Sequence, residues 1–176
     1  MVYIETERLV LRQYKPTDEN DFIRLFQDPA VMRYFLETKT TTEAQAIFLK
    51  FQRLIAEKGY SVFAVEEKES QQFIGFIGLN RFEFDVDFAP AIEILWRLVP
   101  EFWNKGYATE GAKACLNFAR EKLKLKQVYA FTTVSNTPSE QVMIKSGMTY
   151  VKNFNHPLVP AHHAFVEHKL YVMQFD

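Results

Sequence analysis

The sequence is poor in cysteine, with Cys115 the only one among 176 residues. A single cysteine excludes an internal disulfide framework, and without a Cys-x-x-Cys pair nothing indicates a thiolate metal site. Cys115 also falls on the apolar stripe of a predicted helix, which favours a small core residue over a nucleophile. We therefore expect a reduced, cytoplasmic protein without a resident metal.

An excess of one charge is also missing, because 21 basic residues nearly balance 22 acidic ones. A protein that binds nucleic acid or an anionic membrane would show a basic surplus. No apolar run reaches the roughly eighteen residues of a membrane span, and no charged and apolar leader opens the sequence. We expect no nucleic-acid or membrane partner, and a monomer or homodimer.

Repeats, low-complexity tracts and flexible linkers are absent as well. The length suits one domain over residues 1–176, and an apolar content of 48% with 17 phenylalanines provides ample core material. Periodicity predicts an α+β fold that begins with two helices, one capped by Thr17 and one running from Thr40 to Gly59. Strands are expected at 7–14, 60–66, 72–84, 91–99, 127–134, 148–154 and 164–174, and further helices at 106–123 and from Thr137 to Gly147.

The most informative segment joins the strand at 91–99 to the helix at 106–123 and reads WNKGYA over residues 103–108. The start of a helix presents unpaired N–H groups and partial positive charge, both of which suit a phosphate. Gly106 and Ala108 would let phosphate oxygens approach the backbone, and Lys105 could add a charge. A simple turn is the commoner explanation of such a glycine, but the glycine sets of dinucleotide and nucleoside-triphosphate sites are missing.

The segment from Glu93 to Gly147 resembles the GNAT superfamily of N-acetyltransferases, whose pyrophosphate loop reads Gln/Arg-x-x-Gly-x-Gly/Ala. WNKGYA matches this loop at Gly106 and Ala108, while Trp103 departs from its first residue. One branch, the acetyltransferases of ribosomal-protein N-terminal amines, commonly has an aromatic there. Further segments resemble that branch: PEFWNKGYATEG, Asn136-x-x-Ser139, Lys145-Ser146-Gly147-Met148 and the opening ETERLVLRQYKPTDENDF.

The resemblance implies a mixed, mostly antiparallel central sheet, flanked by helices and splayed between the strands at 91–99 and 127–134. Acetyl-CoA would lie in that split, with its pantetheine amides paired to the backbone from Arg97 to Val99, Leu98 included, like an added strand. Asn136 and Ser139 would face the arm from the other side, unless Asn136 only caps the next helix. The pyrophosphate would bind the backbone N–H groups of Asn104, Lys105, Gly106, Tyr107 and Ala108.

Glu93 is the candidate base for acetyl transfer to an amine. A lysine-like amine has a pKa of about 10.4, so its deprotonation needs a base or a water relay. Glu93 interrupts an apolar strand beside the expected split, which favours this role, although an outward-facing strand residue gives the same pattern.

Ser139 is the candidate acid for the departing thiolate. Many members of the superfamily use a tyrosine, at a position that Met143 occupies here. Either Ser139 donates the proton, as the resembling branch suggests, or no acid is needed because a thiol with a pKa near 8.5 leaves readily.

Other residues have simpler explanations. Phenylalanines from Phe73 to Phe88 are expected mainly in the core, with the end of this stretch as an alternative lining for an acceptor pocket. Tyr34 and Phe35 fall in the region that, by resemblance, covers the acceptor side. Four histidines show no metal-ligand spacing and are expected on loops or strand surfaces: His156, His162, His163 and His168.

These patterns predict an acetyl-CoA-dependent N-acetyltransferase that acts on a primary amine by direct attack in a ternary complex. The acceptor would be the α-amine of a protein N-terminus or a small-molecule amine. Two alternatives stay open. One is a catalytically inactive coenzyme A-binding sensor or interaction module, and the other is a structural domain that binds no cofactor.

Overall fold

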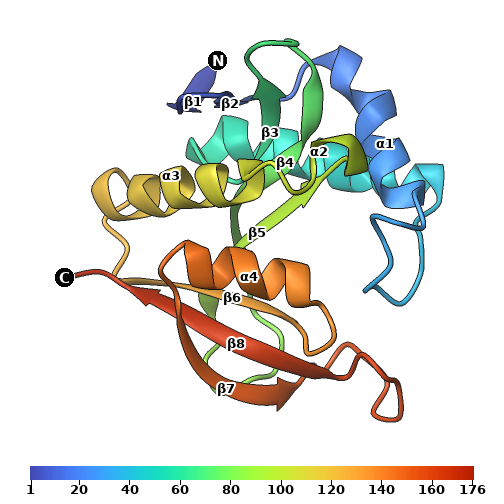
Figure 1. Cartoon of the computed structure of the whole chain (residues 1–176), viewed down its shortest axis with the longest axis vertical. Helices are drawn as coiled ribbons and strands as arrows, with labels where there is room; N and C mark the ends of the chain where they lie inside the picture. The colour runs from blue at the N-terminus through green and yellow to red at the C-terminus, as the bar shows by residue number, and fades with distance from the viewer.

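The computed structural model describes residues 1–176 as an eight-stranded sheet with helices on both faces (Figure 1). The strands are β1 (Val2–Glu5), β2 (Leu9–Arg12), β3 (Val62–Glu67), β4 (Phe73–Phe82), β5 (Ala91–Leu98), β6 (Gln127–Thr133), β7 (Thr149–Asn155) and β8 (Glu167–Gln174). The helices are η1 (Pro16–Asp18), α1 (Glu19–Gln27), α2 (Thr41–Lys58), η2 (Pro100–Phe102), α3 (Tyr107–Glu121) and α4 (Thr137–Lys145).

The strand order is β1-β2-β3-β4-β5-β6-β8-β7, and every neighbouring pair is antiparallel except β5 with β6. This arrangement confirms the predicted α+β fold with its mostly antiparallel sheet. None of the helices is long and apolar enough to cross a membrane.

Different helices cover the two faces of the sheet. On one face, the Phe76 ring of β4 lies 5.5 Å from the Phe22 ring of α1 and 6.0 Å from the Phe51 ring of α2. On the other face, α3 packs closely enough that a Cβ on Gly111 would lie 2.3 Å from Cδ1 of Ile77. In Figure 1, α3 and α4 lie in front of the sheet, and the two helices are in contact.

The predicted helix over 40–59 is confirmed at both ends. Thr40 forms a capping box with Glu43, and Gly59 ends α2 in a left-handed conformation with φ 75°. The N-terminal expectations need correction, because a separate strand, β1, precedes the predicted one, and Thr17 lies in η1 without capping α1. The N-cap of α1 is Asp18, whose carboxylate binds Arg12 instead of the helix.

Arg12 is a buried cation that connects three elements. Its guanidinium donates to both Asp18 oxygens, at 2.7 and 3.0 Å, and to Glu66 of β3 at 2.7 Å. Both Arg12 and Asp18 are at most 5% exposed. Buried charges are tolerated only when paired, so loss of one partner leaves an uncompensated charge in the interior.

We expect Asp18→Ala to lower the free energy of unfolding by about 3 to 5 kcal/mol, because the buried Arg12 cation loses one of its two carboxylate partners. Urea denaturation followed by circular dichroism measures this loss. The matched control is Asp21→Ala, which removes an exposed partner of Arg24 and should cost less than about 1 kcal/mol. Similar losses in the two variants would contradict the assigned role of Arg12.

Candidate functional site

The sheet opens between β5 and β6. These parallel strands share one registered pair, Glu93 with Tyr129, whereas β4 pairs with β5 from Phe82 to Gly75. Beyond Glu93, the edge of β5 that faces β6 therefore has no strand partner. This observation confirms the predicted splay, which widens toward Leu98 and the loop that follows it.

The loop after β5 has two residues in the left-handed region, Asn104 with φ 58° and Gly106 with φ 82°. Gly106 is also the N-cap of α3. A Cβ at Gly106 would meet only the Arg8 side chain at 3.4 Å, so the positive φ, and not crowding, favours glycine here. The free N–H groups of the first α3 turn begin at this point, as an anion site requires.

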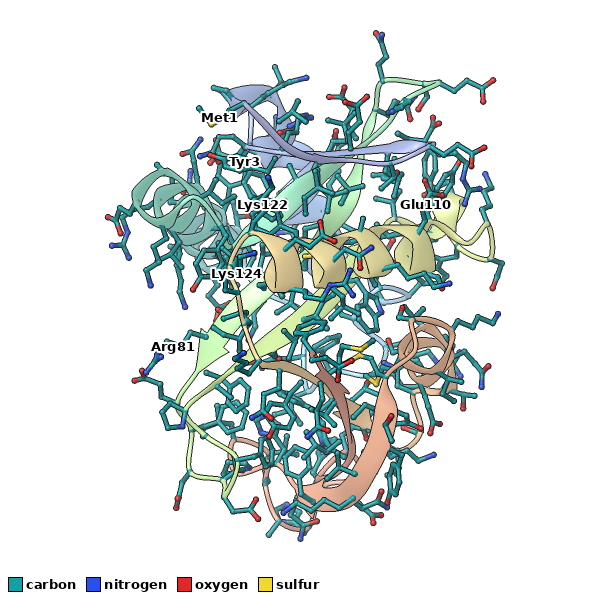
Figure 2. All side chains as sticks on the ribbon, turned by 90° about the vertical axis from the view of Figure 1, so that its left-hand side faces the viewer. Met1, Tyr3, Arg81, Glu110, Lys122 and Lys124 are labelled. Atoms are coloured by element: carbon teal, nitrogen blue, oxygen red, sulfur yellow. The ribbon has the colours of Figure 1, made fainter.

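Arg8 holds this loop in place, a role that the sequence did not reveal. Its Nη1 donates to the Lys105 carbonyl at 2.9 Å, its Nε donates to Glu110 at 2.7 Å, and its guanidinium lies 4.4 Å from the Tyr107 ring centre. In Figure 2, Glu110 lies near one end of α3, and Lys122 and Lys124 lie near the other end.

Hydrogen bonds from neighbouring residues keep Glu110 ionised. Although burial raises the pKa of this carboxyl, hydrogen bonds from Thr6 and Arg8 outweigh that effect and lower it. The carboxylate is thus engaged by the turn between β1 and β2. The Lys105 ammonium forms no ion pair and lies 5.0 Å from the Phe102 ring centre, so the loop keeps an available cation.

Trp103 connects the loop to the open edge of β5. Its indole Nε1 donates to the Leu98 carbonyl at 2.7 Å, and its side chain is 40% exposed. The Val99 N–H donates to Ile74, and the Val99 carbonyl accepts from Phe102. At Val99 an extended arm can therefore use only the second lone pair of that carbonyl, and its pairing with Leu98 and Val99 stays a prediction.

Glu93 lies where the split begins. It is half-buried, and this burial raises the pKa of its carboxyl to about 7, against an opposing hydrogen bond from Asn80 Nδ2 at 2.9 Å. Asn80 is the registered partner of Glu93 on β4. A carboxyl with this pKa exchanges protons readily near neutral pH, which is the property of a general base.

Asn136 and Ser139 lie at the start of α4, on the face of the sheet opposite Glu93. Asn136 is 8% exposed, accepts from the Ser139 N–H at 3.3 Å and donates to Thr132 at 2.9 Å. Asn136 is thus the N-cap of α4, as the alternative explanation of this residue predicted. The Ser139 side chain is half-buried, and its hydroxyl forms no hydrogen bond within the protein.

Other side chains near this site are already paired or buried. The Glu140 carboxylate accepts from Lys169 and Tyr171 at 2.8 Å. Burial and this bond raise the pKa of Tyr171 to about 12, which makes it a poor acid. Met143 is buried at 2% exposure, and Cys115 is fully buried with a thiol pKa raised to about 12.

An aromatic cluster covers β6, β7 and β8 on the Glu93 face. Phe88, from the loop between β4 and β5, packs 5.4 Å from Tyr129, the partner of Glu93. His156 lies in the loop after β7 and His168 on β8, both half-buried, and their rings are 4.9 Å apart among Phe131 and Phe154. Burial, followed by His168, lowers the pKa of His156 to about 4. No group of three potential metal ligands occurs in the structure.

Comparison with known proteins identifies similar chains. A family model described as an acetyltransferase (GNAT) domain matches residues 8–149. The uncharacterized N-acetyltransferase YnaD of Bacillus subtilis (strain 168) is 32% identical over 148 residues, which are 84% of this chain and 82% of that protein. A crystal structure of an acetyltransferase (GNAT family) from Bacillus anthracis superposes with a TM-score of 0.81 at 26% identity, over 99% of this chain and 98% of the other.

RimL, a ribosomal L7/L12 alpha-N-protein acetyltransferase in complex with coenzyme A, has a TM-score of 0.80 over 100% of this chain and 99% of its own. Its sequence identity is 14%, so this likeness shows a common fold alone. The suspected branch of ribosomal-protein acetyltransferases thus shares the architecture of this chain.

We expect Arg8→Ala to weaken the affinity for coenzyme A by about tenfold, because the loop from Asn104 to Ala108 loses the contacts that hold it. Isothermal titration calorimetry measures this change. Arg24→Ala removes an exposed arginine of α1 and should leave the affinity unaltered. Equal affinities in the two variants would show that the loop does not depend on Arg8.

Proposed function

Because this chain belongs to the GNAT acetyltransferase family, we propose that it transfers the acetyl group of acetyl-CoA to a primary amine. The observation that carries the proposal is the split between β5 and β6, which has a carboxyl of pKa about 7 at its closed end and a helix N-terminus beyond its open end. Family membership supports acetyl transfer to an amine. The donor, the residue roles and the mechanism are proposed here.

We assign the pyrophosphate of acetyl-CoA to the backbone of Asn104, Lys105, Gly106, Tyr107 and Ala108. Support comes from the left-handed residues at 104 and 106, the unpaired N–H groups that open α3 and the free Lys105 ammonium. When bound, acetyl-CoA supplies an activated acetyl thioester and leaves as the thiol. We assign the pantetheine arm to the backbone of Leu98 and Val99, at the open edge of β5.

Glu93 is the proposed base. An amine attacks a carbonyl carbon only through a free lone pair, so one proton must leave the nitrogen before or during attack. Glu93 accepts this proton, directly or through one water, and Asn80 orients the carboxylate by its hydrogen bond. Because the base is active when ionised, the rate should rise as the pH passes through about 7.

Ser139 is the proposed acid for the departing sulfur. Its free hydroxyl supports this assignment, as does its place on the opposite face of the sheet from Glu93. Asn136 is a positioning residue, since its amide is used in capping α4 and in contacting Thr132. Holding both reactants in the split should supply much of the rate, with proton transfer adding to it.

We expect acetyl-CoA to bind with micromolar affinity, about −8 kcal/mol, and Gly106→Ala to weaken this binding by about tenfold. Titration calorimetry, with ADP as a ligand control, tests the assignment. Gly59→Ala is a matched variant, because Gly59 also has positive φ and open space around it but lies at the end of α2. A folded protein that binds no acetyl-CoA would disprove both the enzyme and the coenzyme A-sensor functions.

We expect Glu93→Gln to lower kcat by about 10²- to 10⁴-fold without changing the affinity for acetyl-CoA. Thiol release with a panel of amines and N-terminal peptides measures kcat, and the wild-type profile should rise through pH 7. Glu121→Gln, on the surface of α3, serves as a control. Wild-type rates for Glu93→Gln would refute the base, and coenzyme binding without thiol release for any amine would favour the sensor.

A further inference from the structure

Arg97 of β5 is a half-buried cation whose guanidinium has no polar partner within the protein. Its Nη1 atom is buried and has no hydrogen bond, and no carboxylate lies close enough to form an ion pair. Burial lowers the pKa of this guanidinium to about 10, so the group still carries its charge at neutral pH. Arg12, which is 5% exposed and contacts Asp18 and Glu66, shows that this fold can pair a buried arginine.

Three aromatic rings surround the Arg97 guanidinium. Its central carbon lies 4.2 Å from the ring centre of Phe35, 4.5 Å from that of Phe26 and 5.3 Å from that of Phe76. Aromatic faces attract a cation, but they offer no strong acceptor to the N–H groups along the edge of the guanidinium. The cation is therefore held in position while its hydrogen-bonding capacity is unused, and such a buried group requires an explanation.

The position of Arg97 relates it to the proposed base. Arg97 pairs with Phe76, and Glu93 pairs with Asn80, so both side chains project from the same face of β5. The two residues are about 13 Å apart along the strand, on the stretch that forms one wall of the split. Phe35, which covers Arg97, belongs to the loop between α1 and α2 and is 46% exposed.

We propose that Arg97 binds a carboxylate carried by the amine acceptor, while the amine of the same molecule lies at Glu93. This inference rests on the proposed function and narrows its acceptors to amines that also bear a carboxylate. The guanidinium would form two parallel hydrogen bonds to the carboxylate, which replaces the Phe35 ring at its outer side. The spacing of about 13 Å between the two positions along β5 favours an acceptor whose amine and carboxylate are several bonds apart, such as an ω-amino acid or a short peptide.

The first experiment compares matched acceptors with the full-length protein. Lysine, 6-aminohexanoate and short free-acid peptides are each paired with their C-terminal amides, and kcat/KM is measured by thiol release. We expect wild type to prefer the carboxylates by at least about tenfold, the size of one charge-assisted contact. In Arg97→Met this ratio should fall to near one through a rise in KM, and Arg97→Lys should restore part of it.

A structural role alone for Arg97 predicts different results. Arg97→Met would then lower the rates of both members of each pair equally and reduce the melting temperature. If Arg97 binds the acceptor, Arg97→Met should have a melting temperature no lower than that of wild type, because methionine replaces a buried, unpaired charge. A wild type without a preference for carboxylates, or a uniform loss of rate in Arg97→Met, would each overturn the carboxylate assignment.

A second measurement does not require turnover. With coenzyme A present, N-acetyl-6-aminohexanoate should raise the melting temperature of wild type more than its amide does, and this difference should vanish in Arg97→Met. If no amine releases thiol but this difference persists, the proposed function fails and the Arg97 site stands. Turnover without any carboxylate preference, in rate or in stabilisation, would overturn the Arg97 inference alone.

Discussion

The parallel contact of β5 with β6 at Glu93 and Tyr129 is the constraint on which the rest of the site depends. Parallel neighbours cannot be joined by a tight turn, so the chain must cross over the sheet between them, and α3 provides that crossover. The start of α3 consequently lies just beyond the end of β5. Because the two strands pair at one position only, the same topology leaves a backbone edge uncovered beside a helix N-terminus.

Buried charges are paired with opposite charges in one part of the molecule and not in another. Near the N-terminus, Arg12 meets two carboxylates, and the cluster fastens β2, η1 and β3 together. Along β5, Glu93 has one neutral amide partner and Arg97 has aromatic faces only. Incompletely compensated charges reduce stability, so their concentration on one strand beside the split is the distribution expected of a functional surface.

Much of the fold follows from local patterns in the sequence. The capping box at Thr40, the glycine after α2 and the β-rich runs that form β3, β4 and β5 are local signals, and the structure confirms them. The contact of Arg8 with Glu110 joins residues that are distant in the chain, so no local signal announces it. Asn80 could have been found by pairing the meander strands in register, because it lies directly opposite Glu93.

Tertiary pairing also sets the surroundings of groups that residue type alone cannot place. His156 and His168 lie within an aromatic cluster, because the pairing of β7 with β8 brings their rings together. Similarly, the N–H and carbonyl of Val99 bind Ile74 and Phe102, which become its neighbours only after β5 pairs and η2 turns. Residue type and periodicity describe a side chain's preference, whereas tertiary pairing decides which groups are already used.

The contacts of Arg8 also connect two regions thermodynamically. Arg8 belongs to the turn between β1 and β2, at the outer edge of the sheet, and it contacts the Lys105 carbonyl, the Tyr107 ring and Glu110. A ligand that favours the ordered form of the 104–108 loop must, by reciprocity, also favour the closed form of this hairpin. Slower hydrogen exchange at the amides of β1 and β2 would therefore report occupancy of a pocket that these strands never touch.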